Sequence, residues 1–216
     1  GVLKKQKLNN ECDEVYGWWY SIEAGDFNND GLEDLVMGNL GENYKYKAST
    51  EEPFEVFAKD FDSNGSLDIV LSYHEKGKVF PLRGRECSSN QMPFIKEKFP
   101  SYHDFGVADM PTVYGEKNLE NALHYSANTF ATTYIENLGN LKFKTYELEG
   151  IAQFSSVNSI LVEDFNGDGN LDALLSGNLY QSEVETPRND AGYGVLLEGN
   201  GKGQFTSRFP NESGLF

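Results

Sequence analysis

Aspartate and asparagine residues recur with one fixed spacing at three places in the chain. Counted from the first aspartate of each segment, oxygen-bearing side chains occupy positions 1, 3, 5 and 9, and a glycine follows position 5. The three sets are Asp26, Asn28, Asp30 and Asp34; Asp60, Asp62, Asn64 and Asp68; and Asp164, Asn166, Asp168 and Asp172. A hard cation such as Ca²⁺ takes about six to eight oxygen ligands, which one short loop can supply when alternate side chains point inward. The spacing therefore predicts up to three calcium sites.

The seventh position of each loop would add a backbone carbonyl ligand, and the glycine would permit the sharp turn. The residues at that seventh position are Leu32, Ser66 and Asn170. An EF-hand loop begins in the same way, but it needs an acidic residue at position 12 on an emerging helix. Position 12 is occupied here by Met37, Leu71 and Leu175. The pattern therefore excludes an EF-hand.

Short apolar runs follow the ninth-position aspartates directly. They read LVM, IVL and ALL, and Gly, Ser or Asn residues bound them. Runs this short, between turn residues, predict buried strands rather than amphipathic helices. Each loop is therefore expected to connect two strands.

The motif D-x-[DN]-x-[DN]-G-x-x-D-[LIA] between apolar strands resembles the FG-GAP or VCBS repeat. Phrases such as SIEAGDF and SILVEDF precede the motif here. The resemblance implies a calcium-bearing β-propeller, as in the head of integrin α subunits. Further phrases, GWWYSIEAGDF, GNLGENYKYKAS and VLLEGNGKGQF among them, resemble large bacterial surface proteins that combine such repeats with an ASPIC/UnbV-type region. These likenesses imply a fold and a setting, but no reaction.

The expected fold is all-β with a helical insertion, a β-propeller segment of about three blades that forms part of a larger propeller. Residues 1–16 are polar and are expected to be a linker or the end of a preceding element. Residues 17–216 are expected to form the propeller segment. A largely helical insertion is expected at about 88–128, where prolines interrupt the strand pattern. The residues there with helical spacing are Leu119, Ala122, Leu123 and Ala127.

Two further expectations concern the blades. The first two loops begin at Asp26 and Asp60, too close for a full four-stranded blade, so the first blade should be reduced or share strands with sequence not present here. The segment TTYIENLGNLKFKTYELEG predicts a hairpin that turns at Gly139-Asn140. Three blades do not close a propeller, so we expect open edges, further domains or a partner chain.

Six residues are candidates for ligand contacts: Trp18, Trp19, Tyr44, Tyr46, Arg83 and Arg85. The two tryptophans could stack on a sugar, although for adjacent Trp residues at the start of a strand, one more often packs in the core and the other covers an edge. The two tyrosines alternate with lysines, which suits a ligand-facing ribbon or an outer strand with one wetted face. The two arginines could clamp an anion or form ordinary ion pairs.

No catalytic motif stands out. The sequence lacks G-x-S-x-G, H-E-x-x-H and Walker patterns, and the three histidines are isolated along the chain. With Lys+Arg 18 against Asp+Glu 34, a net charge of -16 makes nucleic acid an unsuitable partner. No apolar run is long enough to span a membrane. The two cysteines, Cys12 and Cys87, fit no metal spacing, and their pairing stays open.

These observations favour a calcium-stabilised binding module rather than an enzyme. The calcium would be structural, and the module would mediate protein or glycan recognition or the assembly of a surface complex. The setting would be extracellular, with a surface or outer-membrane anchor in a part of the protein not present here. The alternative is part of a carbohydrate-active enzyme, such as a polysaccharide lyase built on a propeller.

Overall fold

The structure is a computed structural model that describes residues 15–182 and 186–214. Its elements form two compact units. Unit 1 comprises Gly1–Lys45 and Phe130–Phe216, and unit 2 comprises Tyr46–Thr129. Most of the expected linker at residues 1–16 lies outside the described residues, and so does Cys12.

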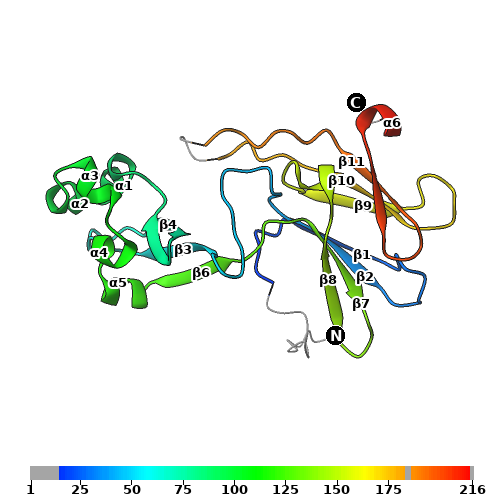
Figure 1. Ribbon diagram of the computed structural model, residues 1–216, viewed down its shortest axis with the longest axis horizontal. Coiled ribbons are helices and arrows are strands. Elements are labelled where there is room, and N and C mark those ends of the chain that lie inside the picture. The colour runs from blue at the N-terminus through cyan, green and yellow to red at the C-terminus, as the bar shows by residue number, and fades with distance from the viewer. Residues whose placement is uncertain (1–14, 183–185, 215–216) are drawn as a thin grey trace. The chain divides into compact units, whose positions relative to one another are not determined.

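Unit 1 contains two four-stranded antiparallel sheets (Figure 1). Sheet A has the order β1-β2-β7-β8, with strands β1 (Ser21–Gly25), β2 (Asp34–Gly38), β7 (Thr133–Asn137) and β8 (Phe143–Glu147). Sheet C has the order β12-β11-β10-β9, with strands β9 (Ser159–Glu163), β10 (Asp172–Ser176), β11 (Val195–Gly199) and β12 (Phe205–Arg208). A 3-10 helix, Gly150–Gln153, and helix α6, Pro210–Ser213, complete the unit.

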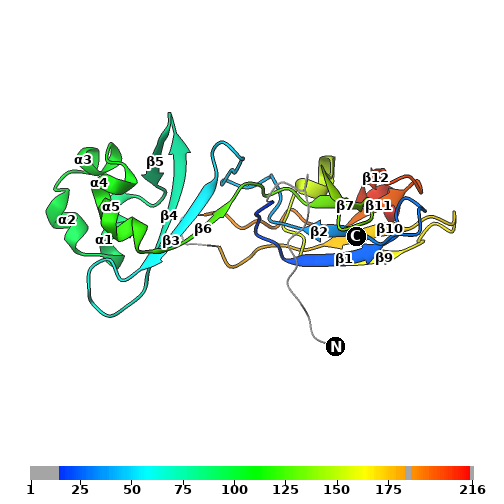
Figure 2. The ribbon, with the colours of Figure 1, turned by 90° about the horizontal axis from the view of Figure 1, so that it is seen from below.

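The two sheets of unit 1 pack face to face. Successive strand residues point to opposite faces, so each sheet has an aspartate face, which carries the ninth-position Asp, and an opposite face. Val36 and Tyr134 on the aspartate face of sheet A belong to one core cluster with Ala173, Leu175 and Leu197 on the opposite face of sheet C. Strands β1 and β9 lie side by side (Figure 2). One blade of unit 1 thus covers the next.

Unit 2 contains sheet B and five short helices. Sheet B has the order β5-β4-β3-β6, with strands β3 (Phe54–Lys59), β4 (Asp68–Glu75), β5 (Lys78–Pro81) and β6 (Leu123–Ala127). The helices are α1 (Arg85–Gln91), α2 (Phe94–Lys98), α3 (Tyr102–Gly106), α4 (Met110–Tyr114) and α5 (Glu116–Glu120).

The helices of unit 2 cover the aspartate face of sheet B. Val70 of β4 forms a buried cluster with Met92, Ile95, Met110 and Val113 from the helical segment. Side-chain caps help to begin two of these helices, because Ser101 accepts from the backbone N–H of Asp104 and Asp109 accepts from that of Thr112. Short helices are marginal alone, so this apolar contact is the main source of their stability.

The predicted fold class is confirmed, since three four-stranded antiparallel sheets and few helices occur within the described residues. The predicted hairpin is confirmed as β7 and β8, with Gly139 and Asn140 in its turn at positive φ. The expectation of a reduced first blade is wrong. Strands β7 and β8 follow unit 2 in the chain and complete sheet A. Leu123 and Ala127 are not helical, because they lie in strand β6.

Burial of Tyr114 in unit 2 gives a pH prediction. Desolvation raises the pKa of Tyr114 from 10.0 to about 12. The folded state therefore holds this proton more tightly than the unfolded state, so the stabilising contribution is complete below about pH 10 and is lost as pH rises toward about 12. Phenolate absorbance should show tyrosines that ionise late, and Tyr114→Phe should lower the amplitude of that late step, to which Tyr134 also contributes. An unchanged titration in the variant would contradict the assignment.

Candidate metal centres

The three acidic loops occupy the same place in each sheet. Residues 26–34 join β1 to β2, residues 60–68 join β3 to β4, and residues 164–172 join β9 to β10. In every case the ninth residue is the first residue of the following strand. The sheets therefore present the loops as rigid turns between antiparallel neighbours.

The first aspartate of each loop accepts two backbone hydrogen bonds from across the turn. Asp26 accepts from the N–H of Asp30 at 3.0 Å through Oδ1 and from the N–H of Gly31 at 2.9 Å through Oδ2. The same two bonds recur in the other loops, from Asn64 and Gly65 to Asp60, and from Asp168 and Gly169 to Asp164. This carboxylate therefore faces the loop interior in all three repeats.

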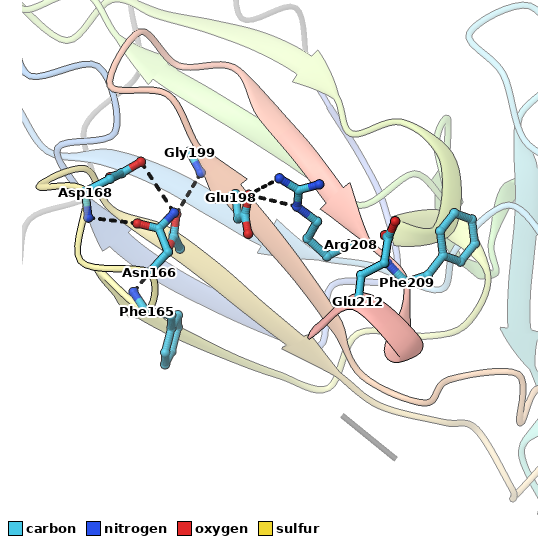
Figure 3. A network of polar contacts seen from close by, with 9 residues as sticks. Phe165, Asn166, Asp168, Glu198, Gly199, Arg208, Phe209 and Glu212 are labelled. Carbon is cyan, nitrogen blue, oxygen red and sulfur yellow. Dashed lines mark hydrogen bonds and ion pairs between the residues drawn. The ribbon is translucent and has the colours of Figure 1, made fainter. Parts of the chain in front are cut away.

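The third and fifth side chains also turn inward. Asn28 Oδ1 accepts from the N–H of Asp30 at 3.0 Å, and Asp30 Oδ1 accepts from the N–H of Leu32 at 2.8 Å. The equivalent bonds lead to Asp62 and Asn64 in the second loop and to Asn166 and Asp168 in the third. Figure 3 shows Asn166 and Asp168 together at the third loop. Three separate sequences thus fold into one hydrogen-bonding pattern.

The backbone of each loop needs a left-handed residue at position 6. Gly31, Gly65 and Gly169 have φ of 86°, 88° and 88° there, a conformation that is costly for other residues. Asn29 and Ser63 at position 4 also have positive φ, at 60° and 61°. The glycine that follows position 5 in the sequence is therefore a requirement of the turn.

The ninth aspartate is buried and ties the loop to its sheet. Asp34, Asp68 and Asp172 are at most 2% exposed. Asp172 accepts from the N–H of Phe165 at 3.0 Å and from the N–H of Gly199 at 2.9 Å, which links the loop to strand β11. Asp68 accepts from the N–H of Phe61 and from the side chain of Gln91 on helix α1.

Asp34 has a phenol as its partner. Tyr134 Oη donates to Asp34 Oδ2 at 2.7 Å, and the N–H of Asn137 donates to Oδ1 at 2.8 Å. Burial and this carboxylate raise the pKa of Tyr134, so the phenol stays a donor. In the same loop, Asn28 Nδ2 donates to Glu136 at 3.4 Å. Loop 26–34 is therefore fastened to strand β7 at two points.

The second loop brings three carboxylates together. Oxygens of Asp60, Asp62 and Asp68 all lie within 4.8 Å of one another, a group that could hold a metal ion. The donors are all oxygens, the ligand type that Ca²⁺ prefers. Backbone hydrogen bonds, chiefly from Gly65, hold the pKa of Asp60 below its ordinary value, so it stays anionic. In the other two loops position 3 is an asparagine, so the matching oxygen is neutral.

The six expected ligand contacts are divided between the two units, three in each. Trp18 packs on Phe130 at 5.2 Å between ring centroids, and its neighbour Trp19 is half-buried. Tyr44 is half-buried in unit 1, whereas Tyr46 in unit 2 is 5% exposed and packs on Phe54. The structure thus shows ring packing for Trp18 and Tyr46, and a ligand contact at any of the four stays a prediction.

The two arginines belong to unit 2. Arg85 donates through Nε to the carbonyl of Phe99 at 2.6 Å and lies over the ring of Tyr102. Arg83 is half-buried and has interactions of its own. Cys87 is half-buried in helix α1. An anion clamp made of Arg83 and Arg85 stays a prediction.

Sequence reasoning missed a polar cluster on the aspartate face of sheet B. Glu55 contacts His74 Nε2 at 3.0 Å through Oε2 and His124 Nε2 at 2.9 Å through Oε1. Ser72 lies opposite Glu55 and is fully buried, and its hydroxyl has no hydrogen-bond partner among the described residues. The expectation of isolated histidines is therefore wrong for these two. The pairing of β6 with β3, which brings His124 to Glu55, is not visible in the local sequence.

An apolar pocket and a polar cleft are found among the described residues of unit 1. An apolar pocket of about 260 Å³ is lined by side chains that include Phe154, Val157 and Tyr193. A polar cleft of about 540 Å³ lies between the outer strands of sheets A and C, where Glu136, Tyr146 and Gln204 contribute to its walls. The cleft also reaches Tyr134, the partner of Asp34.

One family model matches the chain. Residues 18–50 match the FG-GAP repeat, a segment that contains the first loop and strands β1 and β2. Together with the four-stranded sheets, this match supports the FG-GAP family and implies a β-propeller. No curated protein and no solved structure matches the chain. Among the described residues, no helix has the length and apolar character needed to cross a membrane.

Proposed function

We propose that the chain is a calcium-stabilised β-propeller module that binds a protein or a glycan outside the cell. The observation that carries the proposal is the threefold repetition of one loop geometry. In each loop, side-chain oxygens at positions 1, 3 and 5 accept the same backbone hydrogen bonds. The same arrangement of oxygens at three turns is best explained if each turn binds the same kind of ligand.

Calcium suits these loops better than the other common metals. Zinc prefers nitrogen and sulfur ligands, whereas the loop side chains offer oxygen alone. Magnesium demands near-ideal octahedral geometry and retains water, whereas Ca²⁺ accepts irregular sets of six to eight oxygens. The proposed ligands are the oxygens at positions 1, 3, 5 and 9 together with the carbonyls of Leu32, Ser66 and Asn170.

The proposed role of calcium is structural. The loops connect the first two strands of their blades, and the ninth aspartates are buried against neighbouring elements. Bound calcium would offset the repulsion between clustered carboxylates and fix the strand register. Extracellular calcium modules bind with Kd of about 0.1 to 1 mM, which suits the outside of a cell. From the sequence resemblance we infer that the chain belongs to a secreted or surface-anchored bacterial protein, similar to those that combine FG-GAP repeats with an ASPIC/UnbV-type region.

A carbohydrate-active enzyme is the second candidate, and the polar cleft of unit 1 favours it. The cleft offers carboxylates and tyrosines, Glu136 and Tyr146 among them, which could contact a sugar. However, Tyr146 Oη already donates to Glu136, and Tyr134 and Lys144 lie against the Tyr146 ring. The described residues that line the cleft include neither histidine nor arginine. Recognition is therefore preferred over cleavage.

Isothermal titration calorimetry with Ca²⁺ tests the metal assignment. We expect three binding sites in the wild-type chain, with Kd of about 0.1 to 1 mM. Asp60→Asn, Asp26→Asn and Asp164→Asn should each remove one site, because each deletes the carboxylate at position 1. Glu33→Ala, which changes an exposed carboxylate of the first loop that is not among the proposed ligands, is the matched control and should keep all three. Absence of calcium binding to the folded wild-type chain would refute the proposal.

The partner class can be tested separately with the calcium-loaded chain. A glycan array and a panel of candidate surface proteins would distinguish saccharide recognition from protein recognition. Slow cleavage of a bound saccharide would move the assignment to the carbohydrate-active alternative. Binding without product formation would support the recognition module.

A further inference from the structure

The polar cleft of unit 1 opens where the two sheets meet at their outer strands. Its volume of about 540 Å³ lies within the range of about 300 to 1,000 Å³ that is usual for ligand sites. One wall is the aspartate face of sheet A, where Tyr146 of β8 pairs with Tyr134 of β7. The other wall is the opposite face of sheet C, where Ser207 of β12 pairs with Leu197 of β11. The cleft therefore continues the contact between the two blades.

The sheet A wall presents a carboxylate that is held in place. Glu136 of β7 accepts from Tyr146 Oη at 2.9 Å through Oε2 and from Asn28 Nδ2 at 3.4 Å through Oε1. The Tyr146 ring is itself stacked on Tyr134, at 5.8 Å between ring centroids. A carboxylate has about four lone-pair positions, so Glu136 can accept further hydrogen bonds from a ligand without moving. Groups that are fixed in advance lower the entropic cost of binding.

The sheet C wall and its turn supply hydrogen-bonding groups that are open to a ligand. Gln204 Nε2, Lys202 Nζ and Ser207 Oγ belong to residues that line the cleft, and none of these atoms bonds to another described residue. The Gln204 amide is oriented, because its Oε1 accepts from Asn200 Nδ2 at 2.9 Å. Amide and ammonium groups donate, a hydroxyl donates and accepts, and the carboxylate across the cleft accepts. Since saccharide hydroxyls also do both, this mixed set suits a saccharide.

The charges of the cleft favour a saccharide without acidic groups. Glu136, Glu147 and Glu149 line the cleft together with Lys202, and the whole chain has a net charge of -16. An acidic saccharide would therefore meet like charges, which oppose association. Protein–protein interfaces are depleted of charged residues at their core, so this lining also favours a saccharide over a protein partner.

Loop 26–34 contacts both walls of the cleft. On the sheet A side, Tyr134 Oη donates to Asp34 at 2.7 Å. On the sheet C side, the N–H of Gly203, in the turn between β11 and β12, donates to the carbonyl of Phe27 at 3.1 Å. Gly203 has a φ of 68°, and a Cβ there would lie only 2.9 Å from Tyr134 Oη, so this close approach needs a glycine. Calcium that orders this loop would therefore fix the two walls relative to each other.

From this lining and these contacts we propose that the cleft binds an oligosaccharide without acidic groups, and that calcium in loop 26–34 strengthens this binding. The inference rests on the proposed function, because it takes the calcium site from it and selects a saccharide as the partner. A saccharide that bridges the walls binds more tightly when the loop holds both walls in position. The coupling is reciprocal, so the saccharide should strengthen calcium binding by the same factor. Loop 60–68 belongs to unit 2 and takes no part.

Isothermal titration calorimetry of the calcium-loaded full chain with cellohexaose, mannohexaose and hexagalacturonate tests the site. At least one of the two neutral hexasaccharides should bind, and hexagalacturonate should not. Glu136→Gln should raise the Kd of the neutral hexasaccharide by more than about tenfold, and Gln204→Ala by about three- to tenfold, because each removes a hydrogen-bonding group. Glu23→Gln, which changes an exposed carboxylate of β1 outside the cleft, is the matched control and should leave the Kd unchanged.

The same titration tests the coupling to calcium. Chelator, or Asp26→Asn in saturating calcium, should raise the saccharide Kd by about five- to tenfold. Asp60→Asn, the same change at the first position of loop 60–68, should leave it unchanged. Circular dichroism and thermal melting would establish that every variant is folded.

The outcomes separate this inference from the proposed function. The inference fails alone if calcium binds but neither neutral hexasaccharide does, if hexagalacturonate binds as tightly, or if Glu136→Gln binds like the wild type. Equal effects of Asp26→Asn and Asp60→Asn would also overturn it. Absence of calcium binding would instead refute the proposed function, and the coupling with it.

Discussion

Chelation of calcium should lower the unfolding temperature of unit 1 by about 10 °C or more relative to protein in 10 mM Ca²⁺. With Kd of about 0.1 to 1 mM, each occupied site adds about 1.4 to 2.7 kcal/mol to the free energy of unfolding at about 10 mM free ion. Unit 1 contains two loops, so their sum is a large fraction of a typical folding stability of about 5 to 15 kcal/mol. Differential scanning calorimetry with and without a chelator would measure the shift.

The loop variants provide the control for this experiment. Replacing Asp164, Asp168 and Asp172 together by asparagine removes the anionic ligands of the third loop but keeps similar volume. The variant should respond less to calcium than the wild type, while its response to sulfate, which acts through exclusion from the surface, should be unchanged. If the melting temperature of the wild type is the same in chelator as in calcium, the calcium hypothesis is wrong.

The hydrogen-bonding geometry of the three acidic loops follows from the sequence because it is local. Every hydrogen bond that orients Asp60, Asp62 and Asn64 spans at most five residues, and Gly65 follows from the required backbone angle. Loop spacing alone therefore predicted which side chains face inward. The burial of the ninth aspartate was less accessible, because its partners include residues from distant strands.

The pairing of strands that are distant in the sequence could not be predicted from local sequence patterns. Strand β2 pairs with β7, and unit 2 lies between these strands in the sequence. Short strand patterns do not reveal such partners, since an antiparallel pair can form across any loop long enough to return. The helical spacing of Leu119, Ala122, Leu123 and Ala127 predicts a helix. Leu123 and Ala127 lie instead in strand β6, because its pairing with β3 prevails. Tertiary pairing overrides a weak periodicity.

Replacing Asp34 by alanine should destabilise unit 1 even without calcium, by about 3 to 5 kcal/mol. Asp34 is fully buried and accepts hydrogen bonds from Tyr134 Oη and from the N–H of Asn137. Bonds to a charged group contribute about 1.5 to 3 kcal/mol each, and removal of the acceptor leaves two donors unsatisfied. Urea unfolding in the presence of chelator, followed by tryptophan fluorescence, would measure this loss.

A double-mutant cycle isolates the phenol–carboxylate bond from the rest of the effect. Tyr134→Phe keeps the ring against Phe27 and Phe205 and removes the hydroxyl alone, so it should cost about 1.5 to 3 kcal/mol. In the Asp34→Ala background the same change should cost much less, because the buried hydroxyl has already lost its acceptor. Glu33→Ala next to it is exposed and should stay within about 0.5 kcal/mol of wild type. Additive losses would show that Tyr134 and Asp34 stabilise the blade independently. The hydrogen bond between them would then not be the contact that holds loop 26–34 on strand β7.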